Sequence, residues 1–194
     1  MAHFFPIRDA LRYPVRGTRY GLGDKVHRAP NPPAGALIAF FLRDAIEPDG
    51  DKITGSSKAQ DRVKIEIIDD GGTIIRTLKK VPTEAGVNRV AWDLTTDLPD
   101  IFRRDEEMEE WYGPPKGVAV LPGTYTVRLT VDDQVLEETV VVSVDPTVDV
   151  DNTALEAQFA VATELNQAFS AVNRAATGID AVVKQLESRR ANAE

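Results

Sequence analysis

Apolar and polar residues alternate through several short segments of this chain, and this pattern restricts the fold more than any other feature. It is clearest in residues 124–132, where every second side chain is apolar, and it recurs in residues 63–68. A period of two places one face of a β-strand on a core and the other toward water. Alternating and continuously apolar segments together predict strands at residues 36–42, 63–68, 73–78, 87–94, 124–132 and 135–144.

Short turns join most of these predicted strands. Asp69-Asp70-Gly71-Gly72 is a hairpin signal, because glycine accepts the positive φ angles of tight turns. Strands that follow one another without intervening helices form antiparallel sheets packed face to face. We therefore predict a mainly β chain with an antiparallel β-sandwich over residues 34–146, in which Trp92 fills the space between the two sheets.

The region before the predicted sandwich has a different composition. Residues 1–33 are rich in proline, glycine and arginine, and proline blocks helix formation at the residue before it. We expect an extended arm or linker here, with one short helical turn near Asp9 to Tyr13.

The region after it, residues 147–194, is predicted to be helical. Thr153 and Glu156 fit a capping box, and apolar residues then recur at alternating spacings of three and four. The stripe passes Gly178 without a change of phase, which favours one long helix over a hairpin broken near that residue. The stripe either packs on the sandwich or pairs with another helix, which comes from a second copy of the chain or from sequence not present here. The residues expected to mediate association are Leu165, Phe169, Val172, Ile179, Val183 and Leu186.

Charge and composition restrict the classes of partner. The net charge of −8 repels phosphate groups, so we expect no nucleic-acid partner. No apolar run approaches the roughly 20 residues that span a bilayer, and the first residues lack the pattern of a signal peptide. The absence of cysteine excludes disulfides, thiolate nucleophiles and cysteine-based metal sites.

Three stretches together resemble a known family. The first is residues 31–36, Asn-Pro-Pro-Ala-Gly-Ala, and the second is residues 67–94, with the runs Asp-Asp-Gly-Gly and Val-Ala-Trp-Asp-Leu. The third is residues 121–127, Leu-Pro-Gly-Thr-Tyr-Thr-Val. This series resembles the C-terminal region of bacterial secreted β-propeller proteins of the BNR-repeat, sortilin-like type, often labelled glycosyl hydrolases. It is also similar to the immunoglobulin-like domain of flagellar hook-capping proteins.

The resemblance covers roughly residues 30–145 and implies an immunoglobulin- or fibronectin III-like sandwich. It also implies a non-catalytic accessory module of a larger secreted protein, extracellular or periplasmic, whose partner is that protein's propeller. Any hydrolase chemistry would belong to the propeller. The acidic excursion at residues 97–118 departs from the family's shorter pattern.

Other chemistry rests on a few residues. Trp111 and Tyr112 lie between acidic residues and a Gly-Pro-Pro turn. Aromatic side chains in such loops can stack on sugar rings, so the alternative interpretation of the chain is a carbohydrate-binding module that uses these two residues. Calcium is the one cofactor considered, with carboxylate ligands at Asp49, Asp51, Asp69 and Asp70. We expect no catalytic residue, because His3 and His27 lie outside the predicted strands, and glycoside hydrolysis is the remaining alternative.

Overall fold

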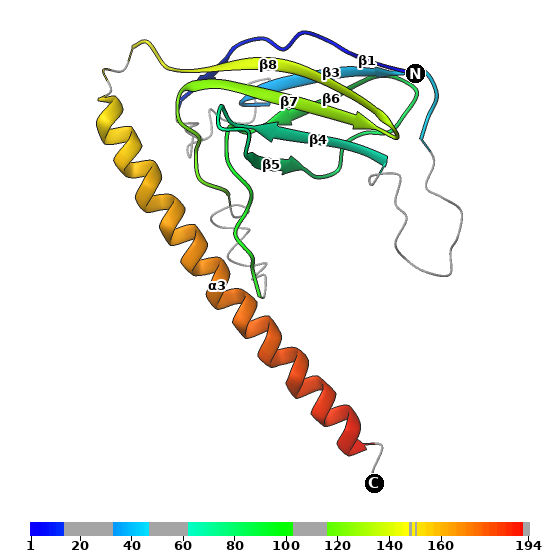
Figure 1. Cartoon of the computed structure of the whole chain (residues 1–194), viewed down its shortest axis with the longest axis vertical. Helices are drawn as coiled ribbons and strands as arrows, with labels where there is room; N and C mark the ends of the chain where they lie inside the picture. Colours follow the sequence, from blue (N-terminus) through cyan, green and yellow to red (C-terminus); the bar gives the residue numbers. More distant parts are fainter. Residues whose placement is uncertain (14–32, 47–61, 103–115, 148, 150, 192–194) are drawn as a thin grey trace, which may run out of the picture. The chain divides into compact units, whose positions relative to one another are not determined.

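The computed structural model describes residues 1–13, 33–46, 62–102, 116–147, 149 and 151–191. These residues form two β-sheets and one C-terminal helix, so the described chain is mainly β (Figure 1). The chain divides into two compact units. We call residues 1–94 and 121–150 the β unit, and residues 95–120 and 151–194 the helix unit.

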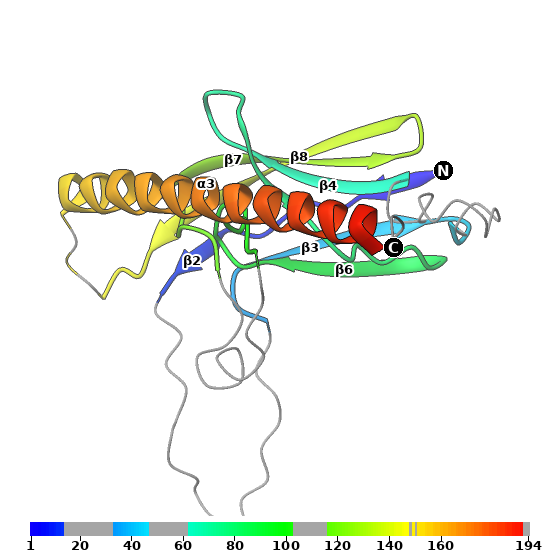
Figure 2. The same cartoon turned by 90° about the horizontal axis from the view of Figure 1, so that it is seen from below.

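The β unit holds both sheets, which form two layers (Figure 2). The first sheet has the order β1-β3-β6, with β1 at Ala2–Phe4, β3 at Ala36–Leu42 and β6 at Gly86–Trp92. The second has the order β2-β8-β7-β4-β5, with β2 at Ala10–Arg12, β4 at Val63–Ile68, β5 at Ile74–Leu78, β7 at Gly123–Val131 and β8 at Gln134–Val144. All neighbouring strands are antiparallel except β2 and β8, which are parallel.

The first thirteen residues belong to the sheets, which corrects the prediction of an arm. β1 pairs with β3, and β2 pairs with β8 where a helical turn near Asp9 to Tyr13 was expected. Ala2, Phe4 and Ala10 are buried, so these short strands add to the core. A strand of three residues is too short to show a period of two in the sequence, and only its pairing partners stabilise it.

Side chains from both sheets meet in one core. Trp92 of β6 is fully buried, and its ring contacts the ring of Tyr125 on β7 edge to face, with 5.3 Å between the centroids. This confirms that Trp92 fills the space between the sheets. The other largest fully buried side chains are Ile38, Phe40, Leu42, Ile65, Ile67 and Leu129.

Strand β3 is buried on one side only. Ile38 and Phe40 are fully buried, whereas Leu37 and Phe41 are 47% and 37% exposed. The continuous apolar run predicts a buried strand, and the structure buries only one of the two faces of that strand. In a two-layered arrangement only one face of each sheet contacts the other sheet.

Tyr125 ties the start of β7 to the turn before it. Its hydroxyl donates a hydrogen bond to the carbonyl oxygen of Leu121, four residues earlier, at 2.7 Å. Burial raises the pKa of Tyr125, the carboxylates of Asp70 and Asp69 raise that pKa further, and Arg12 opposes them.

We expect Tyr125→Phe to lower the free energy of unfolding by about 1 kcal/mol near neutral pH, because the Leu121 carbonyl loses its donor. The raised pKa means that the folded chain holds the phenolic proton more tightly than the unfolded chain. Its stabilisation is therefore complete below the unfolded pKa, about 10, and is lost as the pH rises through the higher folded pKa. Urea unfolding at neutral pH and above pH 10 should show that the difference in free energy of unfolding between the natural chain and the variant becomes smaller as the pH rises. A difference that grows with pH would contradict this account.

The helix unit contains α3, at Asn152–Ala191, which is continuous through Gly178 (Figure 1). The alternative of a broken hairpin is therefore wrong. The helix is capped by Asp151, whose side-chain oxygen accepts a hydrogen bond from the Thr153 N–H at 3.0 Å. This corrects the predicted capping box of Thr153 and Glu156, since a carboxylate just before the first helical residue satisfies the exposed N–H groups there.

The two ends of the excursion between β6 and β7 are joined within the helix unit. The Thr96 N–H donates to the Val118 carbonyl at 2.8 Å, and the Val118 N–H donates to the Thr96 hydroxyl oxygen at 3.0 Å. Thr95 and Ala119 form an isolated antiparallel bridge beside them. The excursion therefore begins and ends as a short paired stem.

Candidate functional site

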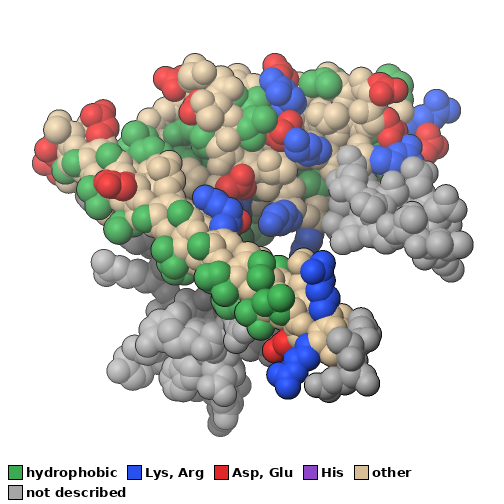
Figure 3. All heavy atoms as spheres, turned by 60° about the horizontal axis from the view of Figure 1, so that its bottom comes forward, with side chains coloured by type: hydrophobic (Ala, Val, Ile, Leu, Met, Phe, Trp, Pro, Cys, Tyr) green, Lys and Arg blue, Asp and Glu red, His purple; other side chains and the backbone are tan. Residues whose placement is uncertain are grey.

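One side of α3 carries a long row of exposed apolar side chains. We call it the apolar band, and it consists of Val161, Leu165, Phe169, Val172, Ile179, Val182, Val183 and Leu186, each 45–68% exposed. Figure 3 shows hydrophobic side chains following the helix for most of its length. All six residues predicted to mediate association lie in this band.

The band follows directly from the spacing of its residues. Leu165, Val172, Ile179 and Leu186 recur every seven residues, which returns each to nearly the same side of a helix with 3.6 residues per turn. On the same side of the helix, alanine occupies positions 162, 168, 175 and 176, so that the band has large side chains separated by small ones. The helix thus presents a continuous apolar surface suited to packing against another helix.

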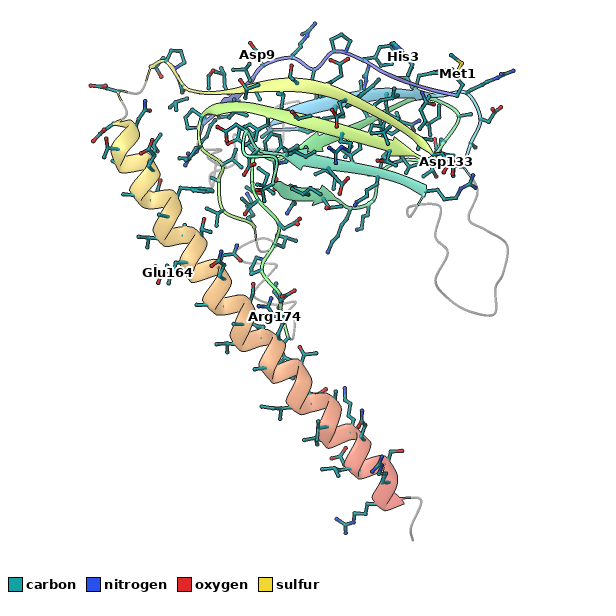
Figure 4. All side chains as sticks on the ribbon, viewed as in Figure 1. Met1, His3, Asp9, Asp133, Glu164 and Arg174 are labelled. Carbon is teal, nitrogen blue, oxygen red and sulfur yellow. The ribbon has the colours of Figure 1, made fainter. Side chains whose placement is uncertain are left out.

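The opposite side of α3 is polar and is held by its own unit. The Asp100 N–H donates to the Ser170 hydroxyl at 3.1 Å, and the Phe102 N–H donates to the Asn173 side-chain oxygen at 2.9 Å. Arg174, labelled in Figure 4, forms an ion pair with Asp100 at 2.5 Å. Ser170 is buried, although serine at a helix surface is usually exposed.

The helix therefore has two sides with different chemistry. Successive helical residues are rotated by about 100°, which places Ser170 and Arg174 on the side away from Val172. The backbone N–H groups of Asp100 and Phe102 find their acceptors on the polar side, and the described contacts leave the apolar band exposed. The sequence signal for the polar side was available in Ser170, Asn173 and Arg174, spaced three and four apart, but their partners lie about 70 residues earlier.

The structure does not test most of the other predicted site residues. Trp111, Tyr112, Asp49 and Asp51 lie outside the described residues, as does His27. The central part of the acidic excursion, residues 103–115, also lies outside them.

Asp69 has a structural partner in the β4–β5 hairpin. Its side-chain oxygen accepts a hydrogen bond from the Thr73 N–H at 2.7 Å, and its backbone bonds to Thr73 and Gly72. Within the described part of the chain, no three histidine, aspartate or glutamate side chains gather as metal ligands would. His3 lies on β1, where its ring contacts the Phe5 ring edge to face at 4.8 Å (labelled in Figure 4).

A second exposed apolar surface was missed from the sequence. On the first sheet, Phe41 pairs with Val87 and Leu37 pairs with Ala91 across β3 and β6. Leu37, Phe41 and Val87 are exposed. The signal was present in the alternation of β6, but the uninterrupted apolar run of β3 indicated a buried strand.

Comparison with known proteins gives no assignment. No protein-family model, no curated protein and no solved structure matches this chain. Among the described residues, no helix is both long enough and apolar enough to cross a membrane.

Proposed function

We propose that this chain is a non-catalytic interaction module, in which an immunoglobulin-like β unit provides a scaffold and α3 associates with another polypeptide. The observation that carries the proposal is the apolar band of α3. As part of a larger secreted protein, the module would act in the extracellular space or the periplasm, as the sequence resemblance implies.

Strand order supports the immunoglobulin-like part of the proposal. Immunoglobulin domains place strands A, B and E in one sheet and G, F and C in the other, with C′ added beside C in variable-type domains. Strands β1-β3-β6 and β8-β7-β4-β5 follow these two orders. The bond from Tyr125 to the Leu121 carbonyl matches the tyrosine corner of such domains, near the start of strand F. The chain departs from antibody domains in having no cysteine pair and in carrying its core tryptophan on β6.

Energetics support association through the band. Burying a large aliphatic or aromatic side chain fully stabilises a structure by about 1.5–3 kcal/mol. The eight band residues are each about half exposed, and they lie in one continuous row rather than scattered singly. Contiguous exposed apolar surface of this kind is typical of sites that bind another protein. Long helices also depend mostly on packing of their apolar side for stability.

The proposal predicts a strong effect of charge in the band. In a triple variant, Leu165→Glu, Val172→Glu and Ile179→Glu, each carboxylate would have to be buried in any interface. We expect the intact chain to sediment as a species larger than one chain and the triple variant to sediment as a monomer. A matched control, Ala160→Glu, Gln167→Glu and Ala181→Glu, adds the same charge at exposed positions outside the band and should leave association unchanged.

A second measurement tests the case in which the band binds a different protein, which the purified sample would not contain. If the intact chain is monomeric, its accessible band should bind the dye anilinonaphthalene sulfonate, which fluoresces on exposed apolar surface. The band variant should lose this fluorescence and the control should keep it. A monomer that binds no dye and is indifferent to both triple variants would contradict the proposal, because the band would then be covered by its own chain.

A further inference from the structure

We propose that the occupant of the apolar band is a second copy of this chain, with the two α3 helices antiparallel and their two-fold axis between Val172 and Ala175. This inference rests on the proposed function and names the partner that the proposed function leaves open. Spacing, side-chain size and charge each support it.

The spacing provides a regular seam. Starting at Val161, exposed apolar residues follow at intervals of four and three, which is the pattern of the two core positions of a heptad repeat. The positions are Val161, Leu165, Ala168, Val172, Ala175, Ile179, Val182 and Leu186. They extend over 26 residues, or about 39 Å of helix at 1.5 Å per residue. A seam that continues for more than three heptads is typical of coiled-coil pairing.

Side-chain size favours the antiparallel arrangement. About an axis between Val172 and Ala175, Ala175 of one copy lies opposite Val172 of the other, and Ala168 lies opposite Ile179. Toward the ends, Leu165 lies opposite Val182, and Val161 opposite Leu186. Every alanine then meets a larger β-branched residue, and no polar residue enters the seam.

A parallel pair in register would pack less well. It would place Ala168 against Ala168 and Ala175 against Ala175. Two layers of the interface would then hold only small side chains, between layers that hold only large ones. Helix interfaces pack closely when large residues face small ones, and voids reduce stability. The sequence of large and small side chains therefore selects the antiparallel pair.

Charge favours the same orientation. From Asp151 to Glu164 the helix segment has three acidic residues and no basic one. From Lys184 to Arg190 it has three basic residues and one acidic residue, Glu187. An antiparallel pair places the acidic end of each helix beside the basic end of the other, whereas a parallel pair places like charges together. The helix dipoles are also opposed in this orientation.

The contacts within the helix unit are compatible with this pairing. Segment 100–102 bonds to Ser170 and Asn173 and pairs with Arg174, all away from the seam. Each copy can therefore keep these contacts while its band is covered by the other copy.

Cysteine cross-linking tests both the partner and the orientation, because the natural chain contains no cysteine. Leu165→Cys and Val182→Cys are made in the full chain, one of them with a small tag, and are unfolded and refolded together before mild oxidation. The antiparallel pair predicts a disulfide-linked dimer of mixed composition as the main product. Each variant alone should remain at the mass of one chain under denaturing, non-reducing conditions, since its cysteines lie far apart. Gln167→Cys, exposed and outside the seam, is the control for random cross-linking.

Several outcomes would overturn the inference. Self-linked dimers of Leu165→Cys alone would show a parallel pair. A dimer by sedimentation that gives no mixed cross-link would exclude this register. A monomeric chain that binds the apolar dye through its band would exclude self-pairing and leave the proposed function intact. A monomer that binds no dye would overturn both.

Discussion

Replacing Trp92 with alanine should lower the free energy of unfolding of the β unit by about 3–5 kcal/mol, the range for large aromatic side chains removed from a core. Trp92 is the largest fully buried side chain, and its ring contacts Tyr125 on the opposite sheet. The alanine variant would lose this contact and leave a cavity between the sheets. Because a domain of this size is stable by only about 5–15 kcal/mol, much of its stability would be lost. Urea denaturation measures the change. It should be followed by far-ultraviolet circular dichroism rather than tryptophan fluorescence, because the variant itself removes a tryptophan.

Val87→Ala is the matched control for this prediction. Val87 lies on the same strand, β6, but its side chain is 60% exposed, so its truncation should change stability by only about 0.5 kcal/mol. If both variants lost the same stability, the loss would come from any truncation on β6 and not from the buried position of Trp92. An unfolding midpoint of Trp92→Ala equal to that of the natural chain would contradict the sandwich-like core.

The second large effect is expected at Gly35, immediately before β3. Gly35 has a φ of +104°, and a Cβ atom built on it would lie 2.0 Å from the carbonyl oxygen of Trp92. That oxygen belongs to backbone, so it cannot rotate away as a side chain could. Gly35→Ala therefore has to displace the pairing of Ala36 with Trp92. Since a residue in a disfavoured backbone region costs about 1–3 kcal/mol before any clash, we expect a loss of about 3 kcal/mol or more.

Gly178→Ala is the same substitution in the opposite environment. Gly178 lies inside α3, is exposed, and an added Cβ would meet no atom within 4 Å. Alanine is the better helix former, so α3 should gain about 0.5–1 kcal/mol. Thermal unfolding of both variants, monitored by circular dichroism, should therefore move in opposite directions. A Gly35→Ala variant as stable as the natural chain would show that the close approach to Trp92 is not required.

Local pattern was enough to predict the longer elements. A period of two indicated β4, β7 and β8, and the spacing of three and four indicated α3 with its apolar band. Gly71 and Gly72 likewise marked the β4–β5 hairpin. These features depend on neighbours within a few residues along the chain, so the sequence alone contains the information.

Other features depend on partners far away in the sequence. Strands β1 and β2 have three residues each, and they exist because β3 and β8 supply hydrogen-bonding partners more than 30 and more than 120 residues later. The one-sided burial of β3 depends on which of its faces meets the other sheet. The cap of α3 is a different case, because it is local. Aspartate and threonine are both good N-cap residues, so propensity alone could not decide between Asp151 and Thr153.

By itself, then, the sequence determined the longer strands, that a long helix follows them, and that one side of this helix is apolar. Only the tertiary structure decided how the strands are ordered in two sheets, that Gly35 must lie against the Trp92 backbone, and that segment 100–102 binds the polar side of α3. The physical reason is the range of the interactions. Periodicity and propensity act between neighbours, whereas sheet order, close backbone approach and hydrogen bonds such as Asp100 to Ser170 form only when distant segments meet.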